Sequence, residues 1–200
     1  MLPKLTSAFL VSAALIACQA LAQQTDESRP RQSTVDRGTP TDMERKTNSA
    51  MSRTVTPQSF TTQAAVISQA EIELGQLAET NSKDPNVRSY AQRMVKDHQA
   101  AAAKLEKIAG AKNLMLPGSL DAEHQALKDK LFKLKGQAFD REYAKAMAKG
   151  HDKAVALFES ASKAAQMPSE LKEFAASTLP TLKEHMEMAH DLHAKEKGGA

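Results

Sequence analysis

The 200-residue sequence predicts an all-α protein, a four-helix bundle with one extra short helix between the second and third long helices. Alanine is abundant and aromatic residues make up only 4% of the chain, a composition typical of closely packed helices. Apolar residues recur every three, four or seven positions over four long segments, which is the period of one helix face. No segment shows the alternation of apolar and polar residues that is typical of a strand.

Residues 1–22 are predicted to be a signal peptide, because Lys4 precedes an apolar run too short to span a membrane well. Two processing sites remain open. Ala20-Leu21-Ala22 fits signal-peptidase cleavage before residue 23, whereas Leu15-Ile16-Ala17-Cys18 looks like a lipobox. Lipidation of Cys18, the only cysteine, would tether the protein to a membrane. Both alternatives predict export to the periplasm, and the second adds an anchor, for example in the outer membrane.

Residues 23–57 are predicted to be a disordered linker, because they are polar and hold too few apolar side chains to form a core. The helical bundle domain is expected over residues 58–195, and residues 196–200 are expected to be a frayed tail. The formal net charge is only +3, and charges of both signs mix along the helices, so no nucleic-acid partner is predicted.

The first two long helices have clear start signals. Pro57-Gln58-Ser59 is expected to begin the first helix, and the break at 81–85 separates it from the second. Asp84 is a cap and Pro85 a first-turn proline for the second helix, which is expected to end near Lys112.

The short helix is expected over 122–135, with Ser119 or Asp121 as its cap and Gly136 at its end. The third long helix is expected over 138–166, and Gly150 in its middle predicts a close helix contact. The last helix begins at Pro168-Ser169, and Pro180 is expected to kink it.

Each long helix carries one polar side chain on its apolar face, near its middle: Glu71, His98, His151 and His185. Counted from the turns, the two members of each helix hairpin match in depth to within about 3 Å. Glutamate and histidine that converge in a bundle core are typical of metal sites, so one interpretation of this cluster is a site for a divalent transition metal. Asp97 and Asp140 flank the cluster as extra oxygen ligands or as acceptors for an imidazole N–H. The alternative is a hydrogen-bonded network that fixes the register of the helices.

A second, weaker candidate lies near the C-terminus, where Met186, His190 and His193 share a helix face. Thioether and imidazole ligands suit copper, whereas the alternative is a polar helix end at which imidazole complements the helix dipole. The sequence has no nucleophile motif of a hydrolase and no glycine-rich phosphate loop, so no catalytic residue is predicted.

The motifs also resemble one family, bacterial domain-of-unknown-function family 4142. The resemblance rests on segments between Phe60 and Leu192, namely 70–78, Tyr90-Ala91, 94–98, Gly136-x-x-Phe139-Asp140-x-x-Tyr143, His151, Phe174-Ala175, Leu179-Pro180 and His185. It implies an exported, ferritin-like helical bundle that is often described as a predicted outer-membrane protein, with no established activity or ligand. The paired Glu-x-x-His motifs of di-iron ferritins are absent from this sequence, which argues against ferroxidase chemistry.

Two functions are therefore expected. The first is a non-enzymatic protein of the cell envelope with a structural or stress-related role. The alternative is a bundle that binds zinc, iron or copper through its inward glutamate and histidine side chains.

Overall fold

The computed structural model describes residues 55–198, which form five α-helices and no strand. The helices are α2 (Pro57–Asn81), α3 (Pro85–Lys112), α4 (Ala122–Phe132), α5 (Gly136–Lys163) and α6 (Ser169–Gly198). The predicted all-α bundle of four long helices and one short helix is thereby confirmed. The expected signal peptide, the lipobox at Cys18 and nearly all of the expected linker lie outside the described residues.

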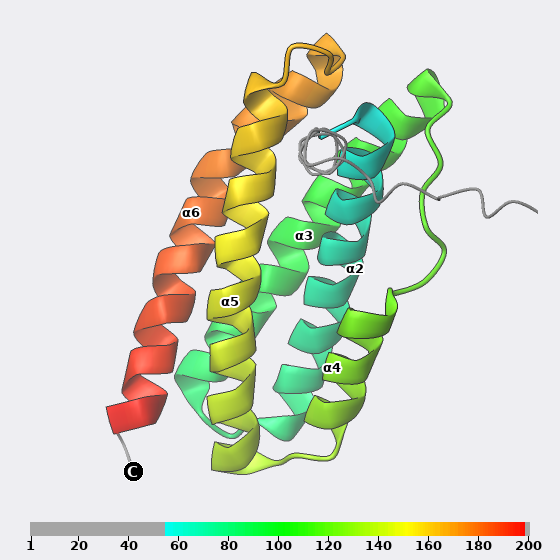
Figure 1. Cartoon of the computed structure of the whole chain (residues 1–200). Helices are drawn as coiled ribbons and strands as arrows, with labels where there is room; N and C mark the ends of the chain where they lie inside the picture. The colour runs from blue at the N-terminus through cyan, green and yellow to red at the C-terminus, as the bar shows by residue number, and fades with distance from the viewer. Residues whose placement is uncertain (1–54, 199–200) are drawn as a thin grey trace, which may run out of the picture.

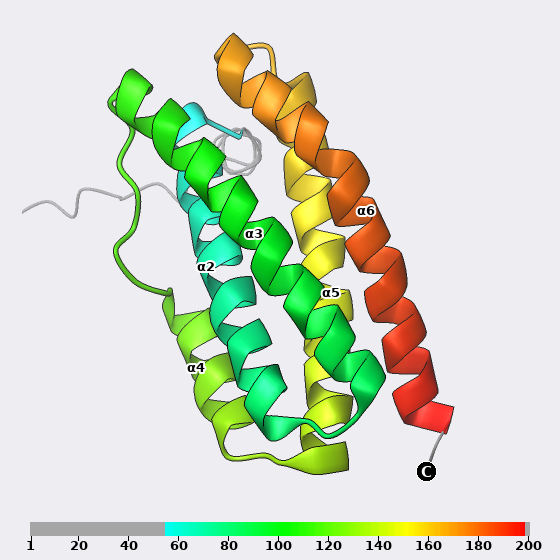
Figure 2. The same cartoon turned by 180° about the vertical axis from the view of Figure 1, so that it is seen from behind.

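The chain builds two antiparallel hairpins, α2 with α3 and α5 with α6, which pack against each other (Figure 1). Between them, the loop 113–121 and α4 lead the chain back along the outside of α2, so that α3 and α5 run parallel (Figure 2). A bundle with one long crossover is typical of ferritin-like folds. None of the helices within residues 55–198 is long and apolar enough to cross a membrane.

Local signals in the sequence explain the helix starts. Thr56 and Ser59 form a capping box at the start of α2, each side chain accepting a hydrogen bond from the backbone N–H of the other. The Asp84 carboxylate accepts from two backbone N–H groups of α3, and Pro85 occupies the first turn, where no amide hydrogen is needed. Of the two caps expected for α4, the structure uses Asp121.

Several expected helix ends differ from the structure. The short helix ends at Phe132, and Gly136 starts α5 instead of ending the helix before it. The chain reverses there with a φ of +52° at Gly136, a left-handed conformation that glycine adopts without steric cost. The last helix extends to Gly198 instead of fraying after residue 195, because Leu192 is packed in the core only two turns before its end.

A polar layer divides the apolar core into two clusters. The lower cluster lies near the α2–α3 turn and includes Leu74, Met94, Tyr143, Met147 and Ala189. The upper cluster lies near the α5–α6 turn and includes Phe60, Leu105, Phe158, Phe174 and Leu182. On every long helix, the polar residue expected on the apolar face falls between members of these two clusters.

Candidate metal site

Three histidines from three helices meet in the polar layer. His98 comes from α3, His151 from α5 and His185 from α6, and all three side chains are buried. Their ring centroids lie 5.5 to 5.8 Å apart. One nitrogen from each ring can be chosen so that the three atoms lie within 4.8 Å of one another. The three histidines therefore converge in the core, as the sequence pattern predicts.

The hydrogen bonds on the outer side of the cluster fix which ring nitrogens carry protons. His151 Nδ1 lies 3.0 Å from the Met147 carbonyl oxygen, which can only accept, so Nδ1–H donates and Nε2 keeps its lone pair. His185 Nε2 lies 3.0 Å from Asp97 Oδ2, so Nε2–H donates and Nδ1 keeps its lone pair. Asp97 thus has the supporting position expected for it.

The inward nitrogens have no partner in the described protein. His151 Nε2, His185 Nδ1 and both ring nitrogens of His98 are buried without a hydrogen bond. A buried polar group left without a partner costs about 1–3 kcal/mol. One nitrogen from each of the three rings lies within 4.8 Å of the other two, so the cluster could satisfy three lone pairs with a single bound cation.

The electrostatics of the cluster favour neutral imidazole. Burial lowers the pKa of His98 well below its ordinary range, and the neighbouring charges of His151 and His185 lower it further. Burial also lowers the pKa of His185, although the hydrogen bond to Asp97 opposes this shift. Metal ions bind the neutral form of imidazole, so the lowered pKa values of His98 and His185 favour the protonation state that a metal requires.

Asp97 is held in turn by Arg93 from the preceding turn of α3. Burial raises the pKa of Asp97, but the hydrogen bonds from His185 and Arg93 outweigh burial and leave the pKa lowered. Arg93 lies 3.3 Å from Asp97 and also forms an ion pair with Glu184 of α6. This chain of carboxylate, imidazole and guanidinium is typical of the groups that orient a metal-binding histidine.

Glu71 lies beside the histidines but on their outer side. Its Oε1 is 3.9 Å from His151 Nδ1, the nitrogen that faces away from the cluster, and Glu71 is not among the three groups that converge. Burial raises its pKa, and the charge of His151 opposes that shift. Gly150 allows the close contact expected at that position, because a Cβ there would lie 3.4 Å from Glu71 Oε1.

The structure does not bring Asp140 to the cluster. Asp140 precedes His151 by eleven residues on α5, about 16 Å along the helix, and interacts with Ser82 and Asp84 at the α2–α3 turn. The C-terminal candidate is also dispersed. Met186 packs against the upper cluster, whereas the His190 ring is 2.8 Å from Asp152 of α5.

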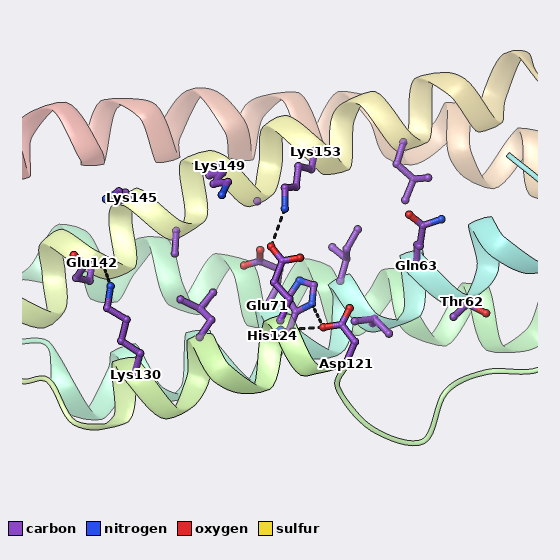
Figure 3. Close-up of a pocket in the computed structure, with 17 residues that line it drawn as sticks. Thr62, Gln63, Glu71, Asp121, His124, Lys130, Glu142, Lys145, Lys149 and Lys153 are labelled. Carbon is purple, nitrogen blue, oxygen red and sulfur yellow. Dashed lines mark hydrogen bonds and ion pairs between the residues drawn. The ribbon is translucent and has the colours of Figure 1, made fainter. Parts of the chain in front are cut away.

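A cavity that the sequence patterns do not predict lies between α2, α4 and α5, with Glu71 in its lining (Figure 3). We call this cavity the trough. Its signal in the sequence is the spacing of Lys145, Lys149 and Lys153, which places three cations on one face of α5.

Comparison with known proteins agrees with the fold. A DUF305 protein of Streptomyces coelicolor that is described as secreted has a TM-score of 0.60 and 16% identity, over 71% of this chain and 94% of that chain. A DUF305 fragment from Deinococcus radiodurans has a TM-score of 0.62 and 18% identity, over 71% of this chain and 99% of that chain. At such identities the likeness shows the fold alone. No curated protein matches the chain.

The family comparison covers more of the chain than the described helices do. The family model described as "Domain of unknown function (DUF4142)" matches residues 42–192, from the last part of the expected linker to α6. It agrees with the resemblance carried by the motifs around Glu71, His98 and Asp140. The chain therefore belongs to the DUF4142 family.

Proposed function

We propose that this protein binds one divalent transition-metal ion through His98, His151 and His185. The observation that carries the proposal is the difference between the outer and inner ring nitrogens of these histidines. Protein acceptors bind the outer nitrogens of His151 and His185, whereas the inner nitrogens, and both of His98, have no partner among the described residues. A bound cation would accept the three inward lone pairs.

Zinc fits this ligand set best, with iron and copper as alternatives. Three imidazoles leave a fourth position of a tetrahedral ion open, as in zinc sites that bind water or a further ligand. Zinc–nitrogen bonds of about 2.0–2.1 Å require nitrogens about 3.3 Å apart, so the rings would move inward from their present separations of up to 4.8 Å. Asp97 and the Met147 carbonyl would orient two of the three ligands.

We further propose that the protein acts outside the cytoplasm. The apolar leader at 1–22 supports export, and the S. coelicolor protein with the same fold is described as secreted. Lipidation at Cys18 would hold the bundle at a membrane through the polar segment that follows. Metal storage or buffering in the cell envelope, with a role in stress tolerance, is compatible with this location and needs no catalytic residue.

The test is metal analysis of the full chain purified from its native envelope. We expect one zinc, iron or copper ion per protein, and loss of that ion in a His98→Ala/His151→Ala variant. His190→Ala is the matched control, because His190 is an exposed histidine outside the cluster and its removal should leave the metal content unchanged. Addition of metal to the stripped protein at about 100 times Kd should stabilise it by about 2.7 kcal/mol.

Two results would refute the proposal. One is the lack of stoichiometric metal together with no thermal shift on adding zinc, iron or copper. The other is full metal content in a folded double variant. The first result would favour the second candidate function, in which the polar layer between the two apolar clusters sets the register of the helices and the protein has a structural role. The second result would place the metal at another site, for example at the C-terminal Met186, His190 and His193.

A further inference from the structure

The trough has the size and lining of a small-molecule site. Its volume is about 560 Å³, within the range of roughly 300–1,000 Å³ that is common for such sites. Along its length it is lined by apolar side chains from all three surrounding helices: Val66, Ile67, Leu127, Ala146 and Leu157. An apolar body of a ligand would therefore bury its surface against α2, α4 and α5.

The roof of the trough is α4, which is held in place by charged pairs. Lys128 of α4 lies 2.7 Å from Glu73 of α2. Two further pairs join α4 to α5, Lys130 with Glu142 and Glu123 with Lys153. Exposed pairs of this kind contribute only about 0–1 kcal/mol each. The main anchor of α4 is Leu131, which is fully buried in the lower cluster.

The side chains at the rim of the trough carry a net positive charge once these ion pairs are counted. Two carboxylates in the lining pair with lysine, Glu123 with Lys153 and Glu142 with Lys130, and the Asp121 carboxylate lies 2.7 Å from His124 Nδ1. Lys145 and Lys149 also line the trough, and neither forms an ion pair within residues 55–198. The four lysines of the lining therefore outnumber the three carboxylates at its rim, Asp121, Glu123 and Glu142. Figure 3 shows Lys149 between Lys145 and Lys153 along α5. The unmatched charge is positive and favours an anionic group on the ligand.

The carboxyl group of Glu71 lies at the inner wall of the trough, which Lys149 also lines. Glu71 is only 6% exposed, and its Oε2 has no hydrogen-bond partner in the described protein. Its other oxygen lies against Gly150, the residue that follows Lys149. Because the carboxyl group of Glu71 and the ammonium group of Lys149 come from opposite sides of the trough, the head group of a ligand could reach both.

We propose that the trough binds a small amphiphilic carboxylic acid, with its apolar body along the trough and its carboxylate at Lys149. A fatty acid and an aromatic acid share this chemistry. The site is separate from the three-histidine cluster, because none of the three histidines lines the trough. The proposal therefore does not depend on metal binding.

Calorimetric titration of the full chain tests the proposal. Decanoate represents fatty acids, 2-naphthoate represents aromatic acids, and decanol is the uncharged control. We expect one acid molecule bound per chain, affinity reduced about tenfold or more by Lys149→Met, and binding abolished by Ala146→Phe, which fills the trough. Lys107→Met removes an exposed lysine of α3 outside the trough and should bind as the wild type does. His98→Leu should also retain acid binding, whatever its effect on metal.

The acid that binds more tightly identifies the source of the ligand. Failure of both acids to bind the wild type would overturn the proposal, as would decanol binding as tightly as decanoate. Unchanged affinity in Lys149→Met would overturn the role of that lysine. Circular dichroism must show that each variant is folded, and Lys149→Met, an exposed substitution, decides the matter if Ala146→Phe does not fold.

Discussion

Replacing His98 with leucine should remove much of the acid sensitivity of the metal-free protein. In the native state, burial holds the pKa of His98 well below its ordinary value, whereas in the unfolded chain the pKa of the ring is about 6.5. Below pH 6.5 the unfolded state therefore binds a proton that the native state does not, and stability falls as the pH falls. The effect is absent above about pH 7.5, grows by about 1.4 kcal/mol per pH unit, and reaches about 2 kcal/mol at pH 5.

Other groups in the polar layer affect both proteins alike, so the comparison isolates His98. The lowered pKa of His185 also destabilises the native state as the pH falls. The raised pKa of Glu71 acts in the opposite direction, because the native state then binds a proton more readily than the unfolded chain does. At pH 7.5 His98→Leu should be at least as stable as the wild type, since it removes two buried nitrogens without partners.

Urea denaturation at pH 7.5 and pH 5.0, with a chelator present, measures the difference. We expect the loss of stability between these pH values to be about 2 kcal/mol smaller in His98→Leu than in the wild type. Met94→Leu, one turn away in the same buried helix face, is the control and should keep the pH dependence of the wild type. A difference between wild type and His98→Leu below about 0.5 kcal/mol would refute the reasoning that His98 is buried and neutral.

Two further predictions concern helix packing and the support of the cluster. Gly75→Ala should destabilise the protein by about 1–3 kcal/mol in thermal unfolding, because the added Cβ would lie 2.7 Å from Val95 Cγ2. Gly110→Ala is the control: a Cβ there would meet no atom within 4 Å, so the substitution should stabilise the helix by up to about 1 kcal/mol. Equal effects at the two glycines would contradict this account of the α2–α3 contact. Asp97→Asn should weaken zinc affinity about 10–100-fold in a competition titration, because a neutral amide holds His185 less firmly; unchanged affinity would remove Asp97 from that role.

The sequence determined the four long helices and the depth of the polar layer. The period of the apolar residues assigns each helix face, and the cap and proline signals at Asp84 and Pro85 place the turns from which depth is counted. These local rules place His98, His151 and His185 on the core face near the middle of their helices, which is where the structure has them.

Which neighbours each group meets depends on how distant segments of the chain pack. The sequence could not show that the chain returns beside α2, that α3 and α5 are parallel, or that α4 roofs a trough, since these depend on contacts between distant segments. For the same reason Glu71 was expected to join the histidines but lies behind His151, and Asp140 lies far from them. The phase of a helix fixes its face, but the packing of its partners fixes which atoms meet, and at this site the packing turns three imidazole lone pairs inward.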